Sequence, residues 1–300
     1  MTLPKLAVAN SGFGGRGYKN PVTGGKEIVP SVTTVLKAEN KPALIQWAVD
    51  QTAGYAVANA TALLSHSEDW GYKYLRWYYK RTPKFETDTP EMEVQSYHEG
   101  VRDDAADMGT AIHEWIQADL VPELQYPDLS NQGEAFWQMV DKWEEWKQGK
   151  EIIPHYTERT VWNPAGYAGT YDGMWEVDGR MTLMDIKSSR GIYDSTWMQV
   201  SALYEAPTQF EPSGDEYTAL HDWQLPVTNL AVLHIRPNDW DNRTGKPMPA
   251  HCKWLEIPGG MDSQKTYYKG FEGLLHYTQA MREITLAGRE REKNEQNSNA

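Results

Sequence analysis

Cysteine is almost absent from this sequence, because Cys252 is the only one in 300 residues. A single thiol rules out an internal disulfide, a four-cysteine zinc site and a cysteine-ligated iron–sulfur cluster within this chain. Any metal that the chain holds must therefore be bound by oxygen atoms and imidazole nitrogens.

Long apolar runs are missing as well. Hydrophobic residues make up 40% of the sequence and charged residues 24%, so the chain is too apolar for disorder and too often interrupted by charge for a membrane span. The apolar run from Leu6 to Ala9 is far shorter than the core of a secretory signal. We therefore expect a cytoplasmic protein with no membrane partner.

Positive charge is scarce too. The formal net charge is −13, the opposite of the basic balance typical of nucleic-acid-binding proteins. Bulk charge therefore argues against a polyanionic partner, although binding depends on the local potential of a groove, which bound divalent cations can invert. The glycine-containing clusters at 12–17 and 21–25 precede no Gly-Lys-Ser or Gly-Lys-Thr, so we expect no nucleotide-driven motor.

Hydrophobic periodicity predicts helices first, then a strand hairpin, a helix, two more strands and a final helix. Ser31 is expected to cap the first short helix. Helices are predicted at 32–37, 42–62, 103–120, 131–147, 195–206 and 263–289, and strands at 156–162, 168–177, 181–187, 230–236 and 253–257.

This order of elements favours one α/β domain over residues 1–288, with a central mixed β-sheet flanked by helices and a helical N-terminal region. A helical insertion is expected at about 40–150, and the polar residues 289–300 are expected to form a disordered tail.

A basic stripe is predicted in the segment 70–84, which interleaves cations with aromatic rings. On a helix, Lys73, Arg76 and Lys80 would share one face, where they could contact a DNA backbone. The alternative is an amphipathic helix that buries its rings and leaves its cations in solvent.

The segment 169–187 carries the clearest chemistry. Asp178-Gly179 between two strand-like runs is the preferred sequence of a two-residue hairpin turn. That turn pairs Val177 with Arg180 and sets Asp172 directly opposite Asp185. Opposed side chains have Cβ atoms roughly 4.5–5.5 Å apart, so two like charges destabilise the sheet unless a cation offsets them.

Lys187 follows Asp185 by two residues, and the alternation of a strand places it on the same face. Two acids and one base around one point suit Mg²⁺ or Mn²⁺, which prefer oxygen ligands and polarise phosphodiesters. Lys187 would orient the attacking water or stabilise charge in the transition state. The alternative is an exposed hairpin with alternating charge.

Together, Gly169-Thr-Tyr-Asp172, Asp185-Ile-Lys187, the upstream Gly109-Thr-Ala-Ile-His113 and the downstream Gln199 resemble the RecB-like branch of the PD-(D/E)XK nuclease superfamily. The likeness is to its Cas4-like and phage exonuclease members, here without an iron–sulfur cluster. It covers roughly residues 31–257 and implies a restriction-endonuclease-like core.

The resemblance also implies roles for individual residues. His113, Asp172, Asp185 and the carbonyl of Ile186 would hold the metal, with Lys187 as the catalytic lysine. Gln199 is a further site candidate, whereas Tyr204 falls one position later than the family pattern requires and is expected to pack in the core. Glu158, in the strand before Asp172, is expected to be a solvated carboxylate rather than an outer contact of the site.

The sequence thus predicts a Mg²⁺- or Mn²⁺-dependent deoxyribonuclease, an exonuclease of phage or bacterial DNA recombination or repair. If it is phage-encoded, it would act in the host cytoplasm. DNA is the expected partner, and an annealing protein or a helicase would be its recombination partner. Two alternatives remain open: a structure-specific endonuclease such as a junction resolvase, and a noncatalytic DNA-binding scaffold with a nuclease fold.

Overall fold

The structure is a computed structural model. It describes residues 6–9, 11–20, 27–39, 42–58, 60, 90–130, 132–213, 216–221, 225–241 and 244–298. The chain divides into two compact units, residues 1–39 with 111–300, and residues 40–110. The first unit contains the central sheet and every described residue of the predicted metal site.

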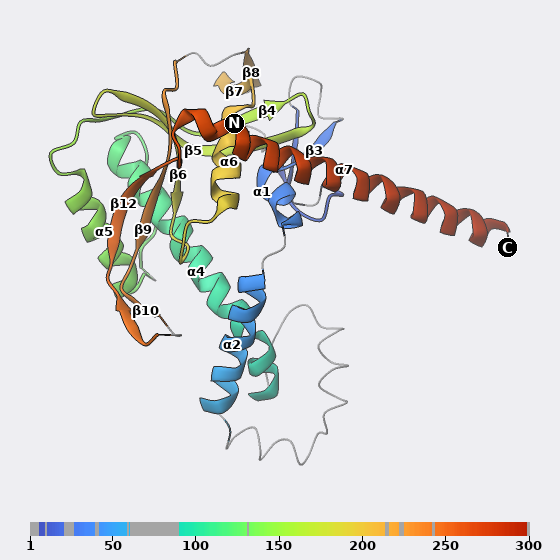
Figure 1. The fold of residues 1–300 in the computed structure, drawn as a ribbon, viewed down its shortest axis with the longest axis horizontal. Helices are drawn as coiled ribbons and strands as arrows, with labels where there is room; N and C mark the ends of the chain where they lie inside the picture. Colours follow the sequence, from blue (N-terminus) through green and yellow to red (C-terminus); the bar gives the residue numbers. More distant parts are fainter. Residues whose placement is uncertain are drawn as a thin grey trace. The chain divides into compact units, whose positions relative to one another are not determined.

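A seven-stranded mixed sheet forms the centre of the first unit (Figure 1). Only the neighbours β6 and β9 are parallel; the other neighbouring pairs of this sheet are antiparallel. The strand order is β12 (His251–Glu256), β9 (Asn229–Arg236), β6 (Arg180–Lys187), β5 (Tyr167–Val177), β4 (Ile152–Asn163), β7 (Thr208–Ser213) and β8 (Glu216–His221). The predicted α/β fold with a mixed sheet flanked by helices is confirmed, whereas β7 and β8 were not predicted.

The turn between β5 and β6 has the predicted geometry. Asp178 and Gly179 have φ values of 50° and 79°, the left-handed conformation that a type I′ turn requires at both positions. Val177 pairs with Arg180, and the same register continues to Gly173 opposite Met184. The hairpin therefore has the register expected from the sequence.

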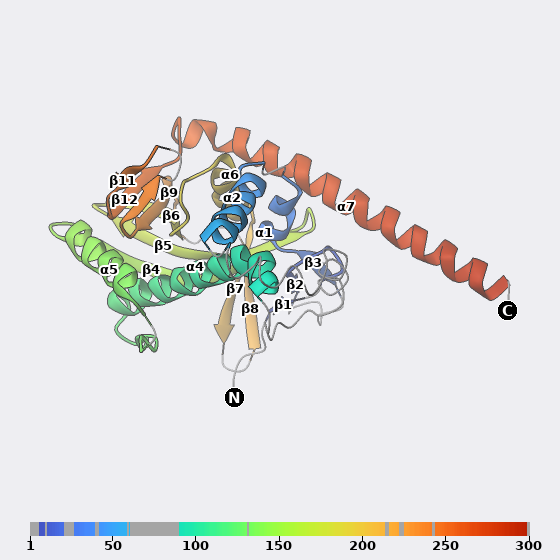
Figure 2. The same ribbon diagram turned by 90° about the horizontal axis from the view of Figure 1, so that it is seen from below.

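Helices cover both faces of the sheet. Figure 2 shows α5 (Glu134–Lys147) and the end of α4 (Pro90–Leu120) on one side, and α6 (Asp194–Tyr204) and α7 (Met261–Ser298) on the other. Buried strands explain this arrangement: every residue of β9 except Arg236 is buried, so this strand needs apolar cover on both faces.

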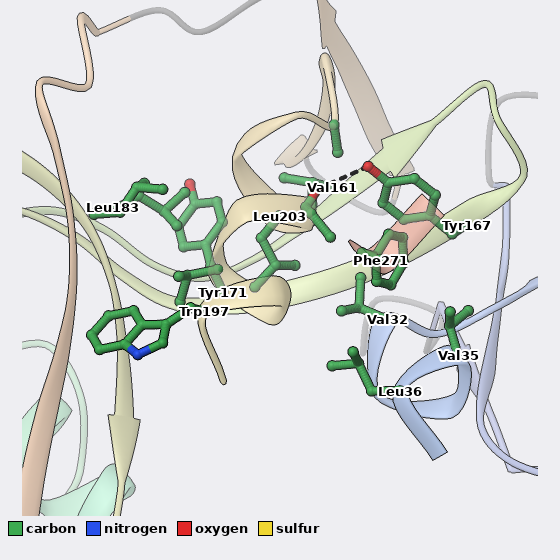
Figure 3. Close-up of a cluster of buried hydrophobic side chains, with 14 of the residues drawn as sticks. Val32, Val35, Leu36, Val161, Tyr167, Tyr171, Leu183, Trp197, Leu203 and Phe271 are labelled. Carbon is green, nitrogen blue, oxygen red and sulfur yellow. Dashed lines mark hydrogen bonds between the residues drawn. The ribbon is translucent and has the colours of Figure 1, made fainter. Parts of the chain in front are cut away.

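The core on the α6 side fixes that helix against β5 (Figure 3). Trp197 and Leu203 of α6 pack in the same cluster as Tyr171 of β5 and Phe271 of α7. Tyr167 adds a buried hydrogen bond, donating from Oη to the Ala202 carbonyl at 2.9 Å. These contacts hold α6, and therefore Gln199, in one position over the sheet.

The N-terminal region is only partly helical. Its described residues form a small antiparallel sheet of β1 (Ala7–Val8), β2 (Gly17–Lys19) and β3 (Ile28–Pro30), followed by α1 (Val32–Val35) and the 3₁₀ helix η1 (Leu36–Ala38). Ser31 caps α1 as predicted, because its hydroxyl accepts a hydrogen bond from Thr34 N at 3.0 Å. Tyr18 and Lys19 of β2 pair with Val29 and Ile28 of β3, and these two β-branched residues favour an extended strand over a helix.

In the second unit, α2 (Pro42–Ala58) lies where a helix was predicted, and α4 begins at Pro90, before the predicted start at 103. Lys73, Arg76 and Lys80 lie outside the described residues, so the predicted basic stripe stays a prediction.

The C-terminal helix departs from expectation. The sequence predicts a disordered tail from residue 289, but α7 continues to Ser298. Residues 289–298 contain strong helix formers, and Arg291 pairs with Glu295 one turn later, at 3.0 Å. A small hairpin of β10 (Asp239–Asp241) and β11 (Lys246–Met248) completes the described strands. Within the described ranges, no helix combines the length and apolar character needed to cross a bilayer.

Candidate active site

Two acidic side chains lie next to each other on the central strands β5 and β6. The paired register of the hairpin ends at Gly173 and Met184, and Asp172 and Asp185 are the next residue on each strand. The Asp185 side chain is 1% exposed and that of Asp172 is 13% exposed. The hairpin thus brings together the two carboxylates that the sequence predicted to share a site.

Asp185 is held by two neighbours, both predicted site residues. Gln199 of α6 donates from Nε2 to Asp185 Oδ1 at 2.9 Å. Lys187 Nζ lies 2.5 Å from Oδ2 as an ion pair. The ammonium of Lys187 is thus the charge partner of this buried oxygen.

Asp172 is oriented by the strand beside it and by α4. The backbone N–H of Ile186 donates to Asp172 Oδ2 at 2.6 Å, and His113 Nδ1 lies 3.5 Å from the same oxygen. The structure therefore places His113, Asp172, Asp185 and Ile186, the predicted metal-binding set, in one cluster beside Lys187. Tyr204, as expected, packs against the core cluster at the end of α6.

A third carboxylate joins this cluster. In the β4–β5 ladder Thr157 pairs with Gly173 and Arg159 with Tyr171, and Glu158 and Asp172 lie between these two pairs. Glu158, Asp172 and Asp185 thus form a row across three neighbouring strands.

The backbone of Glu158 is unusual for a strand residue. Its φ is 48°, in the left-handed region that costs a non-glycine residue of the order of 1–3 kcal/mol. Gln117, one helical turn after His113 on α4, donates from Nε2 to Glu158 Oε1 at 2.9 Å. The residue as a whole is exposed, but its carboxylate is not the solvated group that the sequence predicted, because burial and the nearby Asp172 raise its pKa to about 7.

The row of acids is electrostatically strained. Burial raises the pKa of Asp185 to about 6, with Lys187 opposing the rise and Asp172 adding to it. Burial likewise raises the pKa of Asp172, against the opposing effects of Lys187 and the Ile186 N–H. Burial alone would lower the pKa of Lys187, but Asp185 and Asp172 outweigh it and raise the pKa. The ammonium of Lys187 therefore faces two carboxylates, and its single positive charge cannot neutralise both of them.

His113 is neutral at physiological pH. Burial and the nearby Lys187 lower its pKa to about 4, although Asp185 and the Ile186 backbone oppose this. A neutral imidazole has a lone pair on one ring nitrogen and can ligate a metal ion.

The donor set fits a hard divalent cation. Two carboxylates, a backbone carbonyl and an imidazole are ligands that Mg²⁺ or Mn²⁺ accepts. The described residues do not contain a preformed cage of three or more His, Cys, Asp or Glu ligands. Lys187 and Gln199 instead occupy the two oxygens of Asp185, so a cation at Oδ2 would have to displace the lysine from it.

No protein-family model matches this chain, and no curated protein matches it. The interpretation of the site therefore depends on the geometry described above.

Proposed function

We propose that this protein is a Mg²⁺- or Mn²⁺-dependent DNA nuclease with a restriction-endonuclease-like core. The observation that supports it most is the β5–β6 hairpin, in which Asp172 accepts a hydrogen bond from the Ile186 N–H and Lys187 contacts Asp185. Two carboxylates, a lysine and an adjacent backbone carbonyl are the groups that metal-dependent phosphodiester hydrolysis needs at one point.

The carboxylates would hold the cation, assisted by His113 and the Ile186 carbonyl. A bound divalent cation would polarise the phosphodiester and neutralise charge on its oxygens. This assignment accounts for the excess of buried negative charge, because a cation would offset it.

Lys187 would act on the substrate itself. The raised pKa keeps its ammonium protonated at neutral pH, so it can donate hydrogen bonds to a water or to a phosphate oxygen but cannot accept a proton. Its side chain is 25% exposed, so substrate can reach it. We therefore assign it to orienting the attacking water and stabilising the charge that develops on the phosphate.

Gln199 and the Ile186 N–H would be positioning groups. Each fixes one carboxylate by a single hydrogen bond, Gln199 that of Asp185 and the Ile186 N–H that of Asp172. Gln117 serves Glu158 in the same way. Such fixed orientations reduce the reorganisation that a reaction at this site would require.

The resemblance of the sequence to phage exonucleases favours cleavage from a DNA end, in recombination or repair. The test incubates the purified chain with end-labelled linear DNA and with covalently closed circular DNA, in Mg²⁺ or Mn²⁺ and with a chelator control. We expect metal-dependent loss of the linear substrate alone. Cleavage of the closed circle would indicate an endonuclease, and binding without cleavage of either substrate would indicate a scaffold and refute the proposal.

A further inference from the structure

The glycine-containing segment of residues 11–17 was given no function by its sequence. In the structure it packs tightly against its neighbours. A Cβ atom at Gly17 would lie 2.4 Å from Ser11 Cβ and 2.5 Å from the Val29 carbonyl, and one at Gly15 would lie 2.7 Å from Thr34 Oγ1. A side chain at Gly17 would meet the Val29 backbone, and one at Gly15 would force Thr34 to shift; these two glycines flank Arg16.

The backbone of Arg16 is fixed at the start of α1. Its carbonyl accepts hydrogen bonds from Ser31 N at 3.0 Å and from Thr34 Oγ1 at 2.7 Å. Two residues later, Tyr18 shares a hydrogen bond with Thr170 of β5, Oη to Oγ1, at 3.0 Å. Because Thr170 is two residues before Asp172, Arg16 and the candidate active site belong to one hydrogen-bonded block.

The Arg16 side chain is exposed, and among the described residues it has no ion-pair partner. Its guanidinium carbon lies 5.8 Å from the centre of the Tyr18 ring. An exposed guanidinium beside a hydrolytic site is suited to hold a phosphate through two parallel hydrogen bonds.

Two further cations border the same segment. Lys37 Nζ would lie 3.0 Å from a Cβ atom at Gly15, and the Arg282 guanidinium carbon of α7 lies 4.2 Å from the centre of the Phe13 ring. With Arg16 they form a cationic rim on a chain whose net charge is −13. The rim is the local positive potential that a polyanion needs when the overall charge repels it.

We propose that the cationic rim of Arg16, Lys37 and Arg282 binds the DNA backbone beside the active site, with Arg16 holding the phosphate nearest to the carboxylate row. This inference rests on the proposed function, because it takes DNA as the substrate.

The test measures DNA binding by fluorescence anisotropy with a short labelled duplex in Mg²⁺, over a KCl series. All proteins carry Lys187→Ala so that the DNA probe stays intact. The double variant Arg16→Gln with Lys187→Ala is compared with Lys187→Ala alone, in which the cationic rim is unchanged. The matched control is Arg180→Gln, which removes an exposed arginine of the β5–β6 turn whose partner is Glu256. Unfolding temperatures of the variants verify that each is folded.

We expect Arg16→Gln to weaken binding by about tenfold or more, because a charged hydrogen-bonding group is lost, and to reduce the salt slope by about 0.9 for the lost phosphate contact. Arg16→Lys should restore the slope but only part of the affinity, because lysine keeps the charge and lacks the planar fork. Arg180→Gln should behave like the unchanged rim.

Equal binding by Arg16→Gln and the unchanged rim would overturn the inference, as would an equal loss in Arg180→Gln. Failure of the proposed function has a different signature. If the wild-type chain cleaves no DNA in Mg²⁺ or Mn²⁺ and yet binding depends on Arg16, the proposed nuclease activity is refuted and DNA binding by the cationic rim is supported.

Discussion

Replacing Lys187 by Met should destabilise the folded protein in the absence of divalent cations. Lys187 Nζ lies 2.5 Å from Asp185 Oδ2, in a site where Asp185 is 1% exposed. Methionine keeps an unbranched side chain but removes the ammonium that contacts Asp185. The substitution therefore leaves the buried Asp185 beside Asp172 without the charge of Lys187.

Removing one partner of a buried ion pair typically costs 3–5 kcal/mol, because the other charge stays buried. Lys187 is 25% exposed, so solvent reduces the loss, and we expect about 3 kcal/mol at pH 8. In a chain of this size that corresponds to a fall of about 5–10 °C in the unfolding temperature. Circular dichroism during heating, with a chelator present, measures it.

The double variant Lys187→Met with Asp185→Asn provides the control. It removes the charge that the single variant leaves unpaired, and asparagine can still accept the hydrogen bond from Gln199. We expect the double variant to recover most of the lost stability. The reasoning is refuted if Lys187→Met unfolds at the wild-type temperature, or if the second substitution destabilises the protein further.

Two other predictions concern metal and pH. Mg²⁺ or Mn²⁺ at about 100 times its dissociation constant should stabilise the wild type by about 2.7 kcal/mol, and Asp172→Asn should abolish most of this gain in a thermal shift assay. The pH prediction compares His113→Gln with the wild type in chelator. The pKa of His113 is lowered to about 4, so the unfolded chain protonates first, and this residue costs stability as pH falls from 6.5. The pKa of Asp185 is raised to about 6, so the folded state protonates first, and this residue adds stability over nearly the same range. The unfolding temperature of His113→Gln should therefore rise relative to that of the wild type as the pH falls from about 6.5 to 4.5. A difference between the two unfolding temperatures that stays constant over this range would contradict the lowered pKa of His113.

The sequence predicted the centre of the site because one local signal fixes it. Asp178-Gly179 specifies a turn type, the turn specifies a register, and the register places Asp172 and Asp185 without knowledge of the rest of the fold. Gln199 and His113 also lie in the site, but their choice came from the resemblance, since helical periodicity alone does not tell which residue faces the sheet.

Other parts could not be read from the sequence. Glu158 enters the site through a left-handed backbone conformation in β4, and a glutamate in a strand-like run gives no local sign of it. The packing of Gly15 and Gly17 depends on residues that are distant in sequence, such as Thr34 and Val29. The glycine clusters at 12–17 and 21–25 carry no local sign of the position of Arg16.

The central claim is that the carboxylate row with Lys187 hydrolyses DNA. Its most direct test is the single-turnover rate of cleavage of end-labelled linear DNA in Mg²⁺, comparing wild type with Asp185→Asn and with Glu145→Gln, an exposed carboxylate of α5 that pairs with Lys142. We predict a chelator-sensitive rate that Asp185→Asn abolishes and that Glu145→Gln leaves near the wild-type value. Equal rates for the wild type and Asp185→Asn would contradict the claim.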